Sequence, residues 1–180
     1  MNCFLIFTLI GIITMNGNFA YSHVSPPSVA MTGKIQKQVA PMLAKKYNMQ
    51  LCGAGGGMPD GIVNMLALSY DLKRSLTIEQ ARPILIDCLN TYVNAVNADT
   101  ELRPYLKNYP FTPKNIEIHI FFQTLDGGQV CDPFLCVASS VRGKLIYNTE
   151  EKGQKFGYKT EVIETYEDAV KILNERKNTP

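Results

Sequence analysis

Alternation of apolar and polar residues along four stretches of the chain predicts β-strands. The clearest stretch is residues 116–123, where Ile116, Ile118 and Ile120 alternate with mostly polar neighbours. Residues 66–72 have the same two-residue period, and residues 137–141 and 144–148 form two shorter runs joined at Arg142-Gly143. Strands with one buried and one exposed face produce this pattern. We therefore expect about four strands.

Three other stretches repeat their apolar residues every three to four positions, which predicts helices. The helices are expected at residues 32–47, at residues 77–97 and from Thr165 onward. Thr77 and Gln80 have the spacing of a capping box, in which each side chain bonds the other residue's backbone amide. Pro41 is expected to kink or divide the first helix, and Pro83 to bend the second near its start.

The predicted order of elements, α, β, α, β, β, β, α, indicates an α+β fold. We expect a mostly antiparallel sheet of about four strands with helices packed on one face. The length of the chain, 180 residues, suits a single core. The sequence therefore predicts one domain at residues 32–177.

The first 22 residues contain no Asp, Glu, Lys or Arg, and residues 4–15 form an almost unbroken apolar run. This is the profile of a signal peptide, although no basic side chain precedes the run. The run ends at Asn16, short of the roughly 20 residues that a membrane span needs, which favours cleavage over retention as an anchor. Small side chains at Ala20 and Ser22 favour His23 as the first mature residue. The mature protein is then exported, to the periplasm or beyond, and begins with a Pro-rich tether at residues 23–31.

The charge of the chain is nearly balanced, with 18 basic and 16 acidic residues and a formal net charge of +2. There is no run of lysines or arginines, and no second long apolar run follows the leader. The sequence thus lacks the basic stripe of a nucleic-acid-binding protein. We expect no nucleic-acid partner and no membrane span after cleavage of the leader.

Four cysteines follow the leader, and an exported location favours their oxidation. Cys131 and Cys136 enclose a short turn-like segment, so we expect a disulfide between them. Cys52 with Cys88 is the second expected pair, although four cysteines allow three connectivities. The alternative is four buried free thiols that act as small apolar side chains.

Glycines are concentrated in residues 53–57, and Pro59-Asp60-Gly61 follows. On entropic grounds this composition predicts a loop. A phosphate-binding loop of the Walker type needs a lysine and a hydroxyl residue after its last glycine, and a dinucleotide fingerprint needs a helix there. Residues 53–57 are followed neither by a lysine with a hydroxyl residue nor by a predicted helix. We expect a connector that borders a ligand cleft, with Gly55, Gly56 and Gly57 as candidate binding residues.

The chain contains two histidines, His23 and His119. A mature chain beginning at His23 offers an amine and two imidazoles, the ligands of a copper-binding histidine brace. The Pro-rich tether gives no sign that His23 is held near the sheet, so we expect no metal and no cofactor. The alternation places His119 beside Glu117 and Phe121 on the outer side of its strand, and Phe121 there is a candidate anchor for a partner.

The segment 101–118, which contains Arg103-Pro104-Tyr105 and Tyr109-Pro110-Phe111-Thr112-Pro113, resembles a group of uncharacterised exported bacterial proteins. The likeness extends from about Leu51 through the final helix and includes the Gly-rich segment and Ala81-Arg82. The resemblance implies a bacterial exported origin. It assigns no activity and no functional residue.

Two hypotheses for function follow from these features. The first is a non-enzymatic exported domain that binds a protein or an envelope component through its sheet face or its Gly-rich segment. The second is a small exported hydrolase or metal-dependent enzyme that uses His119 with loop carboxylates such as Asp60 or Asp126. A deep pocket lined by these residues favours the enzyme, whereas a flat apolar patch around Phe121 favours the binding domain.

Overall fold

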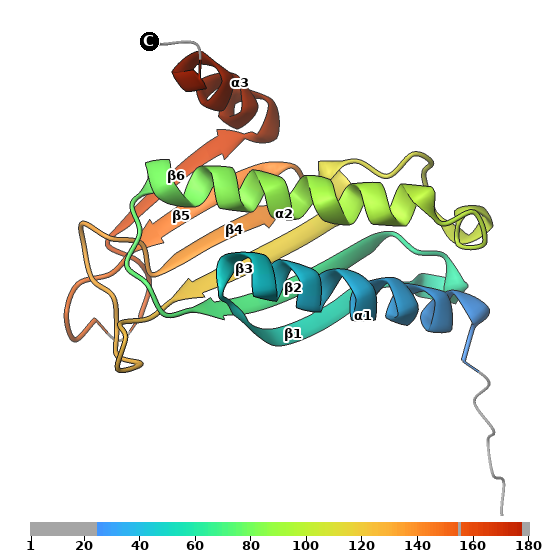
Figure 1. The fold of residues 1–180 in the computed structure, drawn as a ribbon, viewed down its shortest axis with the longest axis horizontal. Helices are drawn as coiled ribbons and strands as arrows, with labels where there is room; N and C mark the ends of the chain where they lie inside the picture. The colour runs from blue at the N-terminus through green and yellow to red at the C-terminus, as the bar shows by residue number, and fades with distance from the viewer. Residues whose placement is uncertain (1–24, 155, 178–180) are drawn as a thin grey trace, which may run out of the picture.

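The computed structural model describes residues 25–154 and 156–177, so the leader and His23 lie outside the described residues. Figure 1 shows the arrangement of the elements. Their order is α1 (Pro27–Tyr47), β1 (Gln50–Gly57), η1 (Pro59–Gly61), β2 (Met65–Leu72), α2 (Ile78–Ala98), η2 (Arg103–Tyr105), η3 (Pro113–Asn115), β3 (Ile116–Phe122), β4 (Val137–Val141), β5 (Lys144–Thr149), β6 (Thr160–Thr165) and α3 (Tyr166–Lys177).

The described strands form one six-stranded sheet in the order β1-β2-β3-β4-β5-β6. Every neighbouring pair is antiparallel except β2 and β3, which are parallel. A parallel pair needs a connection that returns the chain to the starting end of the sheet, and α2 lies in that connection. The fold is α+β with a mostly antiparallel sheet, as the sequence predicts, but with six strands in place of about four.

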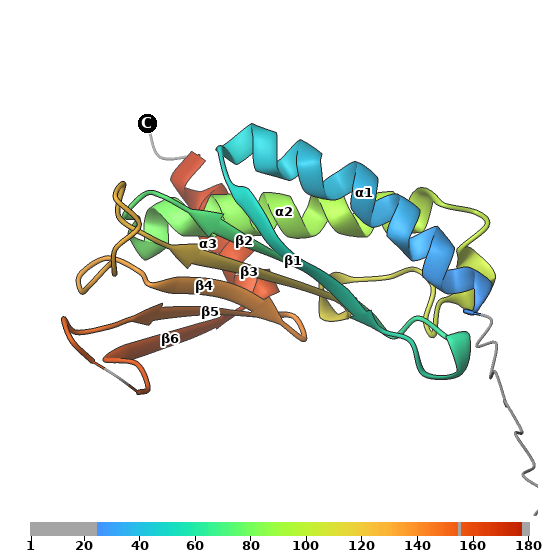
Figure 2. The same cartoon turned by 90° about the horizontal axis from the view of Figure 1, so that it is seen from below.

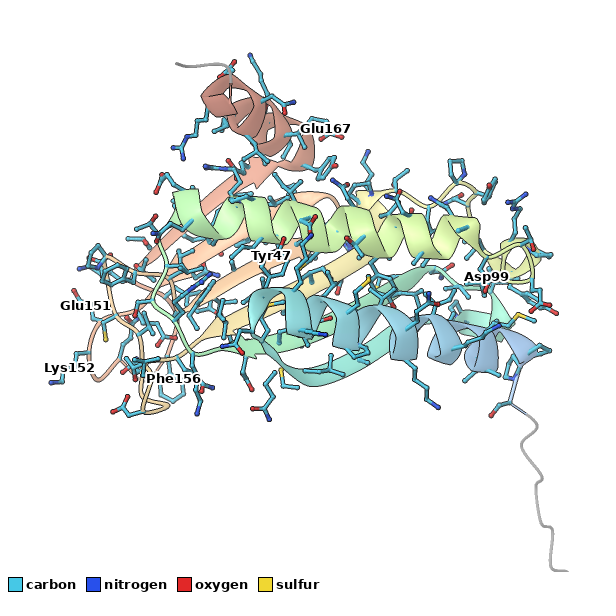
Figure 3. All side chains as sticks on the ribbon, viewed as in Figure 1. Tyr47, Asp99, Glu151, Lys152, Phe156 and Glu167 are labelled. Atoms are coloured by element: carbon cyan, nitrogen blue, oxygen red, sulfur yellow. The ribbon has the colours of Figure 1, made fainter. Side chains whose placement is uncertain are left out.

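Figures 1 and 2 show α1 and α2 side by side on the same side of the sheet. The strand residues that face them are almost fully buried, among them Leu68, Tyr70, Ile118, Ile120 and Tyr147. Hydrogen bonds from two tyrosine hydroxyls are among the contacts that join the helices to one another. Tyr47 lies at the end of α1 (Figure 3), and its hydroxyl donates to the Asp87 carboxylate of α2 at 2.8 Å. The Tyr166 hydroxyl of α3 donates to Asn90 Oδ1 of α2 at 2.6 Å.

The first helix begins at Pro27, five residues before the position expected, so residues 27–31 are helical and not part of an extended tether. Proline is favoured in the first turn of a helix because its missing amide would have no intrahelical partner there. Ser28 fixes this turn by donating its hydroxyl to the Gly61 carbonyl at 2.7 Å. The helix continues through Pro41, which neither ends nor divides it.

Both edge strands of the sheet differ from the sequence expectation. Residues 53–57, predicted as a loop, belong to β1, and β6 was not predicted. A central strand alternates because one face packs on the helices, as in β2. Almost every residue of β1 and β6 is instead exposed or partly exposed on both faces. Neither strand therefore has the two-residue period.

None of the described helices is both long enough and apolar enough to cross a bilayer.

Candidate functional site

The face of the sheet opposite α1 and α2, called here the open face, carries the side chains of His119 and Phe121. Residues two apart in a strand point to the same side, so both project from β3 away from the helices. The two rings stack, with centroids 6.5 Å apart and an angle of 15° between their planes. Phe121 is 39 % exposed, as its position in the alternation predicts.

The register of the sheet places further apolar side chains beside this pair. Phe121 is aligned with Val137 of β4, and His119 with Ser139. The row of His119 continues through Ile146 of β5 to Ile163 of β6, which is 51 % exposed. The result is a shallow stripe of apolar side chains that crosses four strands. We call Phe121, Val137, Ile146 and Ile163 the apolar stripe.

Carboxylates flank the apolar stripe. Asp71 of β2 is aligned with Phe121, and Glu161 lies in the same row at the far edge of the sheet. Glu117 Oε2 lies 3.9 Å from His119 Nε2, which would be an ion pair when the imidazole is protonated. Lys144 is the single basic strand residue that the register places on this face. The strand residues of the open face thus carry more negative than positive charge.

The three candidate glycines lie in β1, separated from His119 and Phe121 by β2. A Cβ atom added at Gly56 would lie 2.8 Å from the Met65 carbonyl oxygen and 2.9 Å from Leu66 Cδ2, whereas one at Gly55 or Gly57 would meet nothing within 4 Å. Only Gly56 is therefore required by packing. The segment is followed by η1 and β2 and not by an α-helix, so it lacks the order of glycine-rich turn and following helix found in phosphate-binding loops.

All four described cysteines are free thiols, so the disulfides expected from the sequence are not formed. Cys52 is exposed at the bulge of β1, while Cys88 is fully buried in α2. Cys131 lies at the surface, and the thiol of Cys136 points inward and donates to the Asn148 carbonyl at 3.2 Å. Burial raises the pKa of Cys88 to about 12 and that of Cys136 to about 11. Both thiols are therefore protonated at neutral pH and are poor nucleophiles.

The residues of the enzyme hypothesis are not brought together. Asp60 lies in η1, which precedes β2 at the end of the sheet where β3 starts, whereas Asp126 lies in the turn that follows the opposite end of β3. Asp126 is engaged in that turn, where hydrogen bonds from Thr124 and the Gly128 amide lower the pKa of its carboxyl group. Among residues 25–154 and 156–177, no cluster of three or more His, Cys, Asp or Glu side chains is placed to hold a metal ion.

One buried polar network was missed by the sequence analysis. Arg82 of α2 makes two hydrogen bonds to the Glu164 carboxylate of β6, at 2.8 and 3.1 Å, and the Tyr147 hydroxyl donates to the same carboxylate at 2.7 Å. The side chains of Arg82 and Glu164 are 8 % and 11 % exposed. The network attaches the edge strand β6 to the helix layer. The sequence signal for this network was Arg82, which adjoins the apolar positions of the predicted helix. Its partner Glu164 is 82 residues away in the sequence, so no local pattern connects the two.

The loop between β5 and β6 and residues 131–132 of the loop before β4 line a charged surface depression of about 370 Å³. Figure 3 shows Glu151, Lys152 and Phe156 at this end of the sheet. Lys159 pairs there with Asp132 at 3.1 Å and with Glu151 at 3.2 Å. Hydrogen bonds to these carboxylates raise the pKa of Lys159. The charges of this depression are largely satisfied by one another, so we give it no catalytic role.

Comparisons of the chain with protein-family models, with curated proteins and with solved structures found no match.

Proposed function

We propose that this protein is an exported, non-enzymatic domain that binds another protein through the open face of its sheet. The observation that supports the proposal is the stacked pair His119 and Phe121, set within the apolar stripe on the face opposite α1 and α2. With all three helices on the helix-covered face, as we propose, the open face is free to bind a partner. Aromatic side chains surrounded by smaller apolar residues are typical centres of binding energy in protein interfaces.

The charges of the open face define the chemistry of the partner. Asp71, Glu117 and Glu161 flank the apolar stripe, and Lys144 is the single basic strand residue on that side. A complementary partner presents an apolar side chain that contacts Phe121, with lysine or arginine around it. Charges of this kind at the rim of an interface mainly accelerate association and select the partner.

A photo-crosslinking amino acid at position 121 tests the proposal in cells that produce the protein. We expect an adduct with one partner protein, whose crosslinked segment combines apolar and basic residues. The same amino acid at Leu125, an 85 % exposed loop residue, is the control and should give no such adduct. Equal crosslinking from both positions contradicts the proposal.

The purified partner then allows the affinity to be measured by titration calorimetry. Phe121→Ala should weaken binding by about 30-fold, because the loss of a central aromatic anchor costs roughly 2 kcal/mol. Leu125→Ala should leave the affinity unchanged. Glu117→Gln should reduce the dependence of the association rate on salt. Wild-type affinity in the Phe121→Ala variant would show that the open face is not the binding site.

A further inference from the structure

The outer edge of β1 presents backbone groups without partners. The Leu72 carbonyl of β2 accepts the Gln123 amide on the β3 side. Alternate residues of a strand point their backbone groups the same way, so Met65, Ala67 and Ser69 point toward β1, where they are aligned with Gly57, Gly55 and Gly53. Ala54 and Gly56 therefore point their amides and carbonyls outward. Within the described residues, no hydrogen bond engages these groups.

An apolar groove runs beside this edge, between α1 and β1. Its volume is about 410 Å³, and it is lined by Gly33, Gln36, Lys37, Ala40, Pro41, Leu51 and Ala54. This volume lies within the range of about 300–1,000 Å³ that is typical of ligand sites. Figures 1 and 2 show β1 as the outermost strand, with α1 above it and no element beyond it.

A glycine in α1 and a polar contact between α1 and β1 together keep the groove open. Gly33 lies inside α1, where glycine destabilises a helix by roughly 1 kcal/mol relative to alanine. A Cβ atom at Gly33 would meet nothing within 4 Å, so packing does not require the glycine. Gln36 fixes the separation of the helix and the strand, because its Nε2 donates to the Gly55 carbonyl at 2.8 Å. The groove is thus held open by a short polar contact.

The charge around the groove has one sign. Lys37 is the single charged residue of the lining. The helix α1 carries four lysines, Lys34, Lys37, Lys45 and Lys46, and no Asp or Glu, and β1 carries no charge. An acidic group on a bound chain would therefore meet a complementary charge beside Lys37.

We infer that the edge of β1 and the groove beneath α1 bind an extended peptide segment of a partner protein by strand addition. The backbone of the segment pairs with Ala54 and Gly56, and alternate apolar side chains enter the groove between Gly33, Ala40 and Leu51. A carboxylate of the segment lies near Lys37. This is the mode in which an exposed sheet edge provides main-chain hydrogen bonds and a neighbouring pocket selects alternate side chains. The inference goes beyond the open-face function and does not depend on it.

A displayed library of random octapeptides, selected against the full protein, tests the inference. We expect enriched peptides with apolar residues at every second position and at least one Asp or Glu. Synthetic versions of one enriched peptide then carry N-methyl groups at alternate residues in one of two registers. Methylation in the register that donates to β1 should weaken binding by about tenfold or more, and methylation in the other register should have little effect.

Two pairs of variants separate the edge from the groove. Ala54→Pro removes the outward amide and should abolish binding, whereas Ala54→Ser keeps the amide and should bind as the wild type does. Gly33→Leu fills the groove and should abolish binding, and it should not lower stability because leucine is a better helix former than glycine. Gly33→Ala should be at least as stable as the wild type and should retain binding. Urea unfolding curves of all four variants verify that each is folded.

Three outcomes overturn the inference. They are enriched peptides without the alternating pattern, equal binding of the two methylation registers, and wild-type affinity in the Ala54→Pro variant. Concentration-dependent dimerisation of the wild type that Ala54→Pro removes would identify a second copy as the occupant in place of a partner peptide. None of these outcomes bears on Phe121, so the two proposals can fail separately.

Discussion

Arg82 is a charged side chain that folding places in an almost fully buried position. Its guanidinium group is retained because Glu164 supplies the opposite charge and the Tyr147 hydroxyl occupies the same carboxylate. A buried charge without a partner is far more costly than a buried pair. The contribution of this network to the stability of the fold therefore depends on the presence of all its members.

Glu164→Gln should destabilise the protein by about 2–3 kcal/mol, because it leaves the Arg82 charge largely buried and uncompensated. Glu161→Gln is the matched control, since Glu161 lies in the same strand and is exposed; its effect should stay within about 0.5 kcal/mol. The free energies of unfolding are obtained from urea denaturation monitored by circular dichroism. A Glu164→Gln variant as stable as the control would show that the pair contributes little.

At the scale of the element, the sequence predicted the four inner strands and missed the two edges. The inner strands β2 and β3 alternate because one side packs on the helices and the other does not. In β1 the glycines provide no side chains to alternate, and in β6 both faces are exposed. The exposure of Phe121 followed from its phase within β3. Asp71 and Val137, which flank Phe121, belong to other strands. Placing them beside Phe121 required the register of the sheet, which no local sequence pattern contains.

Alanine substitutions in the glycine-rich strand β1 test how its residues pack against β2. Gly56→Ala should destabilise the protein by about 1–3 kcal/mol, because the added methyl group would contact the Met65 carbonyl at 2.8 Å. Gly55→Ala should be neutral or slightly stabilising, since its methyl group meets nothing within 4 Å and alanine restricts the unfolded chain. Thermal unfolding of the two variants is the measurement. Equal effects at both positions would contradict the packing of β1 described above.

At the scale of the whole molecule, the proposed export determines the environment in which the domain acts. The apolar leader at residues 4–15 supports export. The exported domain, with its free thiols, would then be in an oxidising compartment. Burial of Cys88 and Cys136 protects these two thiols from reaction.

Intact-mass analysis of the protein recovered from outside the cytoplasm should give the mass of residues 23–180. Alkylation of the unfolded chain without reductant should add four groups, one at each of the cysteines that remain after cleavage. In the native state at pH 8, Cys88 should not react, because burial shields it and raises its pKa to about 12. Full-length protein confined to the cytosol would contradict the proposed export, and alkylation of fewer than four thiols would show that a disulfide forms.

The parallel pairing of β2 with β3 is the place where two halves of the described chain meet within the sheet. One half contains α1, β1, β2 and α2, and the other contains the meander from β3 to β6 with α3. The alignments of Asp71 with Phe121 and of Ser69 with His119 both cross this seam. Because Asp71 lies in one half and the apolar stripe in the other, neither half alone can display the whole surface that we propose for binding. A partner that engages it would thereby distinguish the fully assembled domain from any incompletely folded form.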